Sequence, residues 1–175
     1  VEEQPYLDRL DALRPADSPS DALHALLQLG TEWLGVEHGH LARIDLADGT
    51  HTIEDVSGPH PTVSQGDTRD LSRTFCRSVL ANNAALAIEN AAEEGWDTDP
   101  AYEEFGVSTY VGAKVVAGTD FYGTLCFVDR EARATPLSEA ETAAMELLSR
   151  TAGQLLATDR SASPTPSQLE ALFEQ

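Results

Sequence analysis

The stretch YVGAKVVAGTDFYGTLCF, from Tyr110 to Phe127, decides the fold of this chain. Apolar residues alternate with small or polar residues on both sides of a turn at positions 118–120, which predicts a long β-hairpin. The stretch also holds Lys114, the only lysine in the sequence. An ammonium group in the middle of an apolar strand needs either a partner or a function.

The register of the predicted hairpin follows from the length of its loop. A three-residue loop, Gly118 to Asp120, pairs Val116 with Tyr122, Lys114 with Thr124, and Gly112 with Cys126. A two-residue loop would shift the register and mix the two faces, so the longer loop is favoured. The apolar face then carries Val111, Ala113, Val115, Phe121, Leu125 and Phe127, and the polar face carries Tyr110, Gly112, Lys114, Tyr122, Thr124 and Cys126.

The remaining elements follow from periodicity, caps and turns. Helices are predicted over residues 3–13, from Ser18 to Leu34, from Asp70 or Ser72 to Leu80, from Pro100 to Phe105, and after the Ser138 to Glu141 capping box. Strands are predicted over residues 40–46, 50–56 and 85–88, the first two joined by an Asp48-Gly49 turn. This order predicts an α+β fold, an antiparallel sheet with helices on both faces.

Composition restricts the function classes. The 175 residues suit one domain, and no apolar run reaches the roughly 20 residues of a membrane span, so we expect a soluble, cytoplasmic protein without membrane contact. A formal net charge of -19, spread along the chain, disfavours nucleic acid as a partner. Such acidity with one lysine is typical of proteins from strong brine, where salt screens self-repulsion; the alternative is a surface for a basic partner.

Four segments carry a resemblance to a known family. Thr74 to Val79 (TFCRSV), Asp99 to Tyr102 (DPAY), Tyr110 to Gly112 (YVG) and Tyr122 to Asp129 (YGTLCFVD), in this order of elements, resemble a GAF domain. The resemblance is greatest to GAF domains of multi-domain sensor histidine kinases and related regulators of halophilic archaea. It covers residues 18–159, with a connecting helix at 1–17 and, at 160–175, a linker and the start of a following PAS-like module.

The resemblance implies a sensory module and not an enzyme. GAF domains of this kind bind a small molecule, form homodimers through their terminal helices and act in two-component signalling. The Cys-His pair that holds a bilin is missing, because Cys76 is followed by Arg77, and no cyclic-nucleotide signature is recognisable. The sequence therefore identifies no particular cofactor or ligand.

The resemblance also places a candidate ligand site. In this family long N- and C-terminal helices cover one face of the sheet, and the other face looks into a pocket roofed by short helices and loops, here the helix of Phe75, Cys76 and Val79 and the loop of Trp96 and Tyr102. Ligand sites are usually apolar concavities with a few convergent polar groups. The candidate ligand-binding residues are Lys114, Tyr110, Gly112, Tyr122, Thr124, Cys126 and Cys76.

Structural alternatives stand beside these assignments. Lys114 either binds an anionic or polar ligand, or pairs with Glu89 or Asp129, or extends its stem to water. The tyrosines could be core residues with satisfied hydroxyls, and the two cysteines buried and inert. His38 and His40 share a strand face, but no third ligand with suitable spacing follows, so no metal site and no catalytic site are assigned.

Two other functions remain open at the level of sequence. Cys76 and Cys126 could serve a thiol-dependent enzyme such as a free methionine sulfoxide reductase, as nucleophile and resolving thiol. The domain could also be an empty structural spacer that only dimerises. In a sensory module, a stripe of Met145, Leu148, Ala152 and Leu155 in the last helix would serve the dimer.

Overall fold

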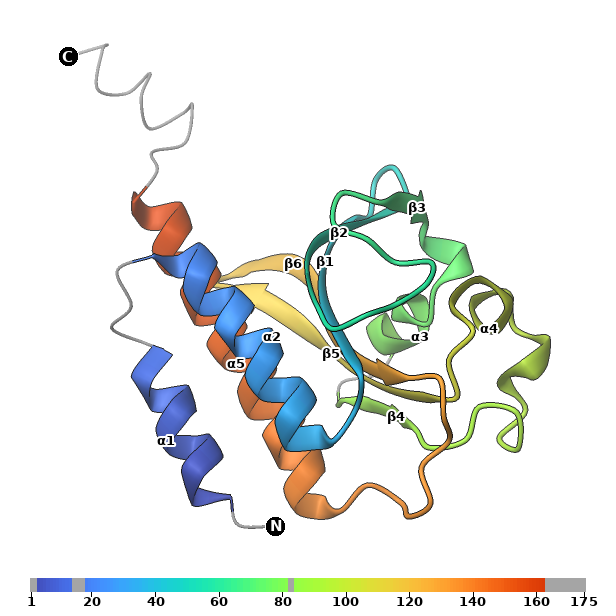
Figure 1. Cartoon of the computed structure of the whole chain (residues 1–175). Coiled ribbons are helices and arrows are strands. Elements are labelled where there is room, and N and C mark those ends of the chain that lie inside the picture. Colours follow the sequence, from blue (N-terminus) through green and yellow to red (C-terminus); the bar gives the residue numbers. More distant parts are fainter. Residues whose placement is uncertain (1–2, 14–17, 82–83, 163–175) are drawn as a thin grey trace.

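The computed structural model describes residues 3–13, 18–81 and 84–162, and it contains one antiparallel sheet with helices on both faces (Figure 1). Three long helices cover one face, and short helices and loops cover the other. The predicted α+β class with an antiparallel sheet is confirmed. Among the described residues, no helix combines the length and the apolarity that a membrane span would need.

Along the chain, α-helices come first and last, and the strands and shorter helices lie between them. The helices are α1 (Gln4–Leu13), α2 (Pro19–Leu34), α3 (Cys76–Leu80), α4 (Pro100–Phe105) and α5 (Glu139–Ala162), with 3-10 turns η1 (Leu71–Arg73) and η2 (Trp96–Thr98). The strands are β1 (His38–Asp45), β2 (Thr50–Ser57), β3 (Thr68–Asp70), β4 (Leu86–Ile88), β5 (Thr109–Ala117) and β6 (Asp120–Asp129). Their order in the sheet is β3-β2-β1-β6-β5-β4.

Helix ends coincide with the caps that the sequence contains. The Ser18 side chain accepts a hydrogen bond from the Asp21 backbone N–H and Pro19 opens α2, while Gly35 closes it in the left-handed conformation at φ 67°. The predicted helix at 70–80 is shorter than expected. Asp70 caps η1 instead, and the α-helical part starts only at Cys76.

The β5–β6 hairpin has the predicted register in its body but not in its loop. Lys114 pairs with Thr124 as predicted, yet Ala117 pairs with Asp120, so only two residues form the loop. The pairing is irregular after Val115: Val115 pairs with Gly123 but Val116 pairs with Phe121, so Tyr122 is an extra residue in β6. This β-bulge compensates for the shorter loop and keeps the predicted register in the body of the hairpin.

This bulge reverses two side chains relative to the prediction. Phe121 packs into the cluster on the α3 side of the sheet, whereas Tyr122 packs against the cluster on the α2–α5 side. The assignment of Tyr122 to the polar face is therefore wrong, because a bulge restores the pairing without restoring the alternation of the residues inside it.

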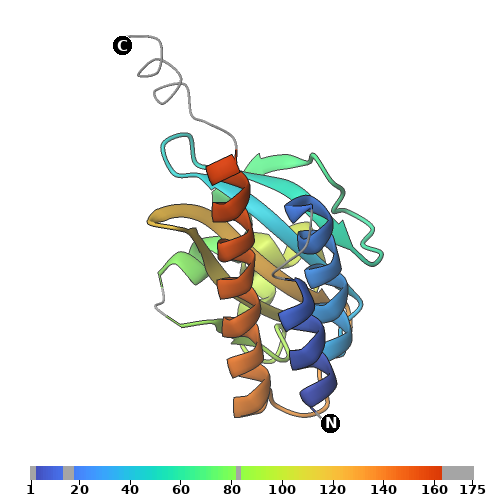
Figure 2. The same ribbon diagram turned by 90° about the vertical axis from the view of Figure 1, so that its left-hand side faces the viewer.

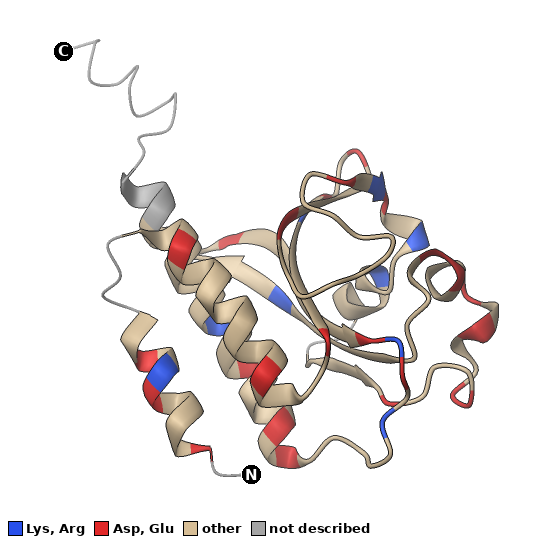
Figure 3. Ribbon diagram, viewed as in Figure 1, with Lys and Arg blue, Asp and Glu red and all other residues tan. Residues whose placement is uncertain are grey.

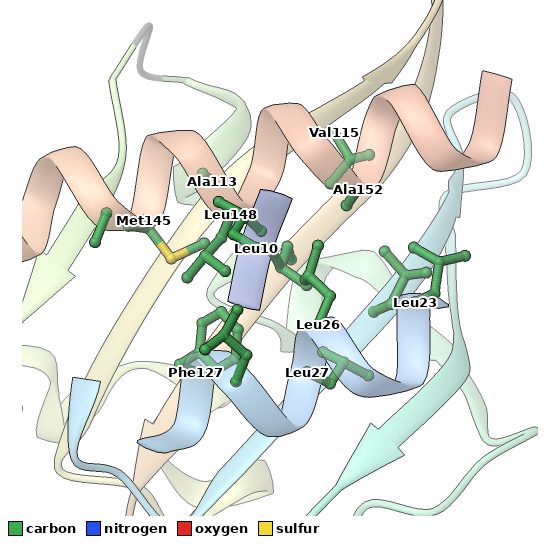
Figure 4. Close-up of a cluster of buried hydrophobic side chains, with 14 of the residues drawn as sticks. Leu10, Leu23, Leu26, Leu27, Ala113, Val115, Phe127, Met145, Leu148 and Ala152 are labelled. Atoms are coloured by element: carbon green, nitrogen blue, oxygen red, sulfur yellow. The ribbon is translucent and has the colours of Figure 1, made fainter. Parts of the chain in front are cut away.

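The first hydrophobic cluster lies between the sheet and the three long helices (Figure 4). Phe127 of β6 is fully buried, and its ring occupies space left by two glycines. A Cβ atom on Gly30 would lie 2.1 Å from the Phe127 ring, and one on Gly39 would lie 2.7 Å from it. Leu10 of α1 reaches between α2 and α5, so α1 packs onto this domain.

The stripe on α5 does not provide a free dimer surface. Met145, Leu148 and Ala152 are completely buried and Leu155 is 5% exposed, all within the chain's own first cluster. Figure 2 shows α5 beside α1 and α2 in front of the sheet. The sequence prediction that this stripe serves the dimer is wrong, because its heptad-like spacing also suits a helix that packs on a sheet. The predicted linker and PAS-like start beyond Ala162 lie outside the described residues.

Replacing Phe127 by alanine should destabilise the fold strongly. The substitution leaves a ring-sized cavity between Gly30 and Gly39, so we expect the free energy of unfolding to fall by about 3–5 kcal/mol. Chemical denaturation at one fixed salt concentration measures it. Leu46→Ala, at a side chain that is 61% exposed, is the control and should change the free energy by about 0.5 kcal/mol or less. A Phe127→Ala effect as small as the control's would contradict this account of the core.

Candidate functional site

Polar side chains gather on the sheet face that looks toward α3 and α4. Thr124 and Cys126 alternate along β6 with the apolar residues that face the long helices, and His40 pairs directly with Cys126 across the β1–β6 ladder. We call the following set the polar layer: His40, His51, Cys76, Tyr110, Thr124 and Cys126, all at most 3% exposed.

The Cys76 sulfur is the centre of the polar layer. It lies 3.0 Å from Thr124 Oγ1, 3.3 Å from His51 Nε2, 3.5 Å from Tyr110 Oη and 3.7 Å from Cys126 Sγ. Tyr110 Oη is also 2.9 Å from Cys126 Sγ. These direct contacts leave no room for a ligand between Cys76 and the strands in this state.

The hydrogen-bond geometry assigns roles to the two thiols. His51 Nδ1 is buried without a partner among the described residues, and Nε2 lies 3.3 Å from the Cys76 sulfur, to which the tautomer with its proton on Nε2 donates. Burial raises the pKa of Cys76, but hydrogen bonds from Cys126, His51 and Thr124 outweigh it and lower that pKa well below its usual value. Burial and the neighbouring Cys76 raise the pKa of Cys126, so Cys76 is the sulfur that can carry the negative charge.

Tyr110 stays protonated beside these sulfurs. Burial, followed by the negative charge on the two cysteines, raises the pKa of its hydroxyl well above the usual value. The Tyr110 side chain lies over Gly112, where a Cβ atom would come within 2.6 Å of Tyr110 Oη. Gly112 is thus required for the position of this tyrosine.

His38 and His60 lie next to the two histidines of the polar layer, His40 and His51. The sequence analysis noted the shared strand face of His38 and His40 but not this group of four. His38 Nε2 is 3.2 Å from His40 Nδ1, and the rings of His38 and His60 have centroids 5.0 Å apart. Burial lowers the pKa of His38 and His40, that of His40 to well below its usual value. Burial also lowers the pKa of His60, to about 4, so His38, His40 and His60 are neutral at pH 7.

Phe105, the last residue of α4, lies at the centre of this group. Its ring is 6.3 Å from His40, 6.4 Å from His51 and 6.3 Å from His60 between centroids. The Arg69 guanidinium lies over the same ring, 4.9 Å from its centroid, and Arg69 Nε is buried with no hydrogen-bond partner among the described residues. An apolar ring therefore covers several polar groups.

α3 and α4 lie over the polar layer. Asp99 caps α4 by accepting a hydrogen bond from the Ala101 backbone N–H, at 2.9 Å, and forms an ion pair with Arg77 of α3. Phe75 and Trp96 make an edge contact with their centroids 5.6 Å apart. The two short helices are tied together over the polar layer.

The structure divides the predicted site. It brings together Tyr110, Thr124, Cys126 and Cys76, with Gly112 beneath the tyrosine. Lys114 lines a separate groove beside α5, and it forms no ion pair with Glu89, Asp129 or any other described residue. Tyr122 lies on the opposite side of the sheet.

The residues that were missed left only weak signals in the sequence. His38, His40 and His51 alternate with other residues on two strands of one hairpin, which is compatible with a shared face. His60, Arg69 and Phe105 come from loops and helix ends, which no periodicity places. Among the described residues, no group of three or more His, Cys, Asp or Glu side chains is arranged to hold a metal ion.

Comparison with known proteins was made for sequence and for structure. The family model described as GAF domain matches residues 18–156. None of the curated proteins matches the chain closely enough to be reported as a relative.

Several solved structures share the fold. The phycocyanobilin-bound GAF domain of a cyanobacterial phytochrome has a TM-score of 0.72 at 16% identity, covering 94% of this chain and 99% of that one. The GAF domain of an Acinetobacter phosphoenolpyruvate-protein phosphotransferase has a TM-score of 0.68 at 16% identity, covering 91% and 98%. The corresponding domain from Coxiella burnetii has 0.70 at 14% identity, covering 94% and 100%.

Acidification should destabilise the protein through the buried histidines. Unfolded histidines titrate near 6.5, whereas the pKa of folded His60 is about 4. Between these values the unfolded chain binds more protons, so the free energy of unfolding falls as pH is lowered through this window. His60→Gln should make the fall shallower in denaturation series across this window. Leu46→Ala, which removes no titratable group from a residue that is 61% exposed, should leave the slope unchanged; equal slopes in all three proteins would contradict the assignment.

The charge state of Cys76 should depend on the two donors that are not thiols, His51 and Thr124. Thr124→Val and His51→Leu each remove a donor to the sulfur, so each should raise the pKa of Cys76. The ultraviolet absorbance of the thiolate, followed during a pH titration in a Cys126→Ser background, reports this pKa. The control is His60→Gln, a residue without contact to Cys76. A Cys76 pKa that neither donor variant moves would show that the contacts carry no charge stabilisation.

Proposed function

Because the chain belongs to the GAF domain family, whose members are small-molecule-binding sensory domains, we propose that it binds a small polar molecule beside the polar layer, beneath α4. The ligand would both accept and donate hydrogen bonds. Arg69 Nε is a buried donor and His51 Nδ1 a buried acceptor, and neither has a partner among the described residues.

The observation that carries this proposal is the burial of so many polar groups on one face of the sheet. A buried polar group costs free energy unless it is hydrogen-bonded, and an apolar face would serve folding at lower cost. The opposite face of the same sheet is in fact apolar. A polar interior with unsatisfied nitrogens is what a binding site for a polar molecule requires.

Phe105 is the residue that the ligand would replace. It fills the space between His40, His51, His60 and Arg69, and it ends a six-residue helix that Gly106 closes at φ 64°. An outward shift of α4 would withdraw the ring and uncover these polar groups. The ion pair from Arg77 to Asp99 holds the start of α4 in place, so the movement would pivot there.

The sheet gives a route from this site to the long helices. β6 presents Thr124 and Cys126 to the polar layer, and Leu125 and Phe127 to the first cluster. The Phe127 ring lies against Gly30 of α2, so a displacement of β6 would alter the packing of α2 and α5. A ligand that favours one arrangement by about 1–3 kcal/mol would shift the population of the two states.

The wider setting is part of the same proposal. We propose that the domain is a cytoplasmic module of a multi-domain signalling protein, such as a sensor histidine kinase of a halophilic archaeon, and that it works as a homodimer through its terminal helices. The formal charge of -19 supports the halophilic origin, because salt-screened acidic surfaces are typical of such proteins. The buried stripe on α5 leaves other helix surfaces for the dimer.

The thiol-dependent enzyme is not favoured. Cys76 is 2% exposed and Cys126 is fully buried, so neither sulfur is accessible to a substrate in this state. A bilin is not proposed either, because Cys76 is followed by Arg77 in place of the histidine of the Cys-His pair.

Native mass spectrometry of the protein as purified from cells tests the proposal. We expect a surplus mass from a noncovalently bound molecule, which Arg69→Gln removes. The matched control is Arg73→Gln, because both arginines pair with Glu104 but the Arg73 side chain is 50% exposed. Retention by Arg69→Gln would place the molecule elsewhere. Absence of any surplus, with no change in the unfolding temperature on adding small carboxylates, nucleotides or imidazoles, would favour the structural spacer.

A further inference from the structure

The outer edge of β5 is only partly covered. β5 runs from Thr109 to Ala117, but β4 pairs only with the segment from Tyr110 to Gly112. From Ala113 to Ala117 the edge has no paired strand among the described residues. Such an edge presents backbone N–H and C=O groups that another extended chain can pair with.

A groove of about 570 Å³ runs between this edge and α5. Its strand side includes Ala113, Lys114 and Val116, and its helix side includes Ser149, Arg150 and Gly153. Val116 is 48% exposed, which is unusual for a large apolar residue in this protein. A Cβ atom on Gly153 would lie 2.2 Å from the Val116 carbonyl oxygen, so α5 covers the backbone of Val116 and leaves the edge open from Ala113 to Val115.

The groove is lined by two cations, Lys114 and Arg150. Figure 3 shows how few Lys and Arg positions the described chain has among its Asp and Glu positions. Neither Lys114 nor Arg150 forms an ion pair with a described residue. Every other lysine or arginine whose side chain the structure describes has a carboxylate oxygen within 3.7 Å. These paired residues are Arg9, Arg43, Arg69, Arg73, Arg77, Arg130 and Arg133. With acids in large excess over bases, two unpaired cations in one groove call for an anionic occupant.

We propose that this edge binds an extended acidic segment of a partner polypeptide, which adds to the sheet as a strand beside β5. The open stretch from Ala113 to Val115 corresponds to about 10 Å of strand, enough for a short segment to begin a ladder. The positive charges of Lys114 and Arg150 would then select an acidic segment, and backbone hydrogen bonds with β5 would hold it as a strand.

The two cations would hold the segment from both sides of the sheet. Ala113 and Val115 pack on the α5 side, so Lys114 between them belongs to the opposite face, while Arg150 projects from α5 itself. Side chains of an added strand alternate between the same two faces. Acidic residues on both faces of the segment would therefore meet a cation. Glu146 also lines the groove, one helical turn before Arg150, and offsets part of the positive charge.

A synthetic peptide tests the proposal directly. The probe is a labelled nine-residue peptide of valines, threonines and four glutamates, titrated with the whole chain by fluorescence anisotropy. We expect binding that weakens between about 0.15 M and 1 M salt, as the Debye length falls from about 8 to 3 Å. The double variant Lys114→Gln, Arg150→Gln should weaken binding about fivefold or more. Arg130→Gln, which changes charge at a residue paired with Glu37, should change it less than twofold.

Two control peptides distinguish the contribution of backbone hydrogen bonds to binding from the contribution of charge. A peptide with lysine in place of glutamate should not bind, and an acidic peptide with alternate backbone amides methylated should bind at least about tenfold more weakly, because it cannot complete the ladder. Equal binding of the methylated peptide, or no binding of the acidic probe, would overturn the proposal. A dimer of the protein alone that the double variant abolishes would also overturn it, by assigning the edge to a second copy.

Discussion

The pairing of β5 with β6 is the constraint on which the rest of the structure depends. Because side chains alternate along a strand, the pairing of Lys114 with Thr124 and of Gly112 with Cys126 decides which residues face each layer. A shift by one residue would bring Thr124 and Cys126 under the long helices and expose Phe127 to the histidines. The bulge next to the turn compensates for the loop length, so the pairing of Lys114 with Thr124 and of Gly112 with Cys126 is kept.

The two layers on either side of the sheet follow different physical rules. The helix layer is held by burial of apolar surface and by close approach, as where the Phe127 ring fits against Gly30. The polar layer is held by a chain of contacts from His51 through Cys76 to Tyr110, in which every donor depends on the next. The first arrangement gives stability, and the second gives a charge-sensitive interior.

Much of the fold could be predicted from the sequence, and less of the site. Periodicity and caps located α2, α5 and both long hairpins, because these signals are local. The bulge at Phe121 and Tyr122 could not be predicted, since a two-residue and a three-residue loop use the same Gly118-Thr119 sequence and the choice is made by packing on both faces. His60, Arg69 and Phe105 come into contact only in the tertiary structure, so their spacing in the sequence does not predict the cluster.

The sequence analysis placed Lys114 in one site with Cys76, Tyr110, Thr124 and Cys126, whereas in the structure Lys114 lines a separate groove beside α5. The ammonium group shares a strand face with Tyr110, yet it lies beyond the end of β4, where the sheet edge opens beside α5. Inside the polar layer neutral imidazoles and a thiolate-prone sulfur set the chemistry, whereas at the edge Lys114 and Arg150 set it by charge. A ligand held by hydrogen bonds and a partner selected by charge can therefore act on the same sheet without competing for one residue.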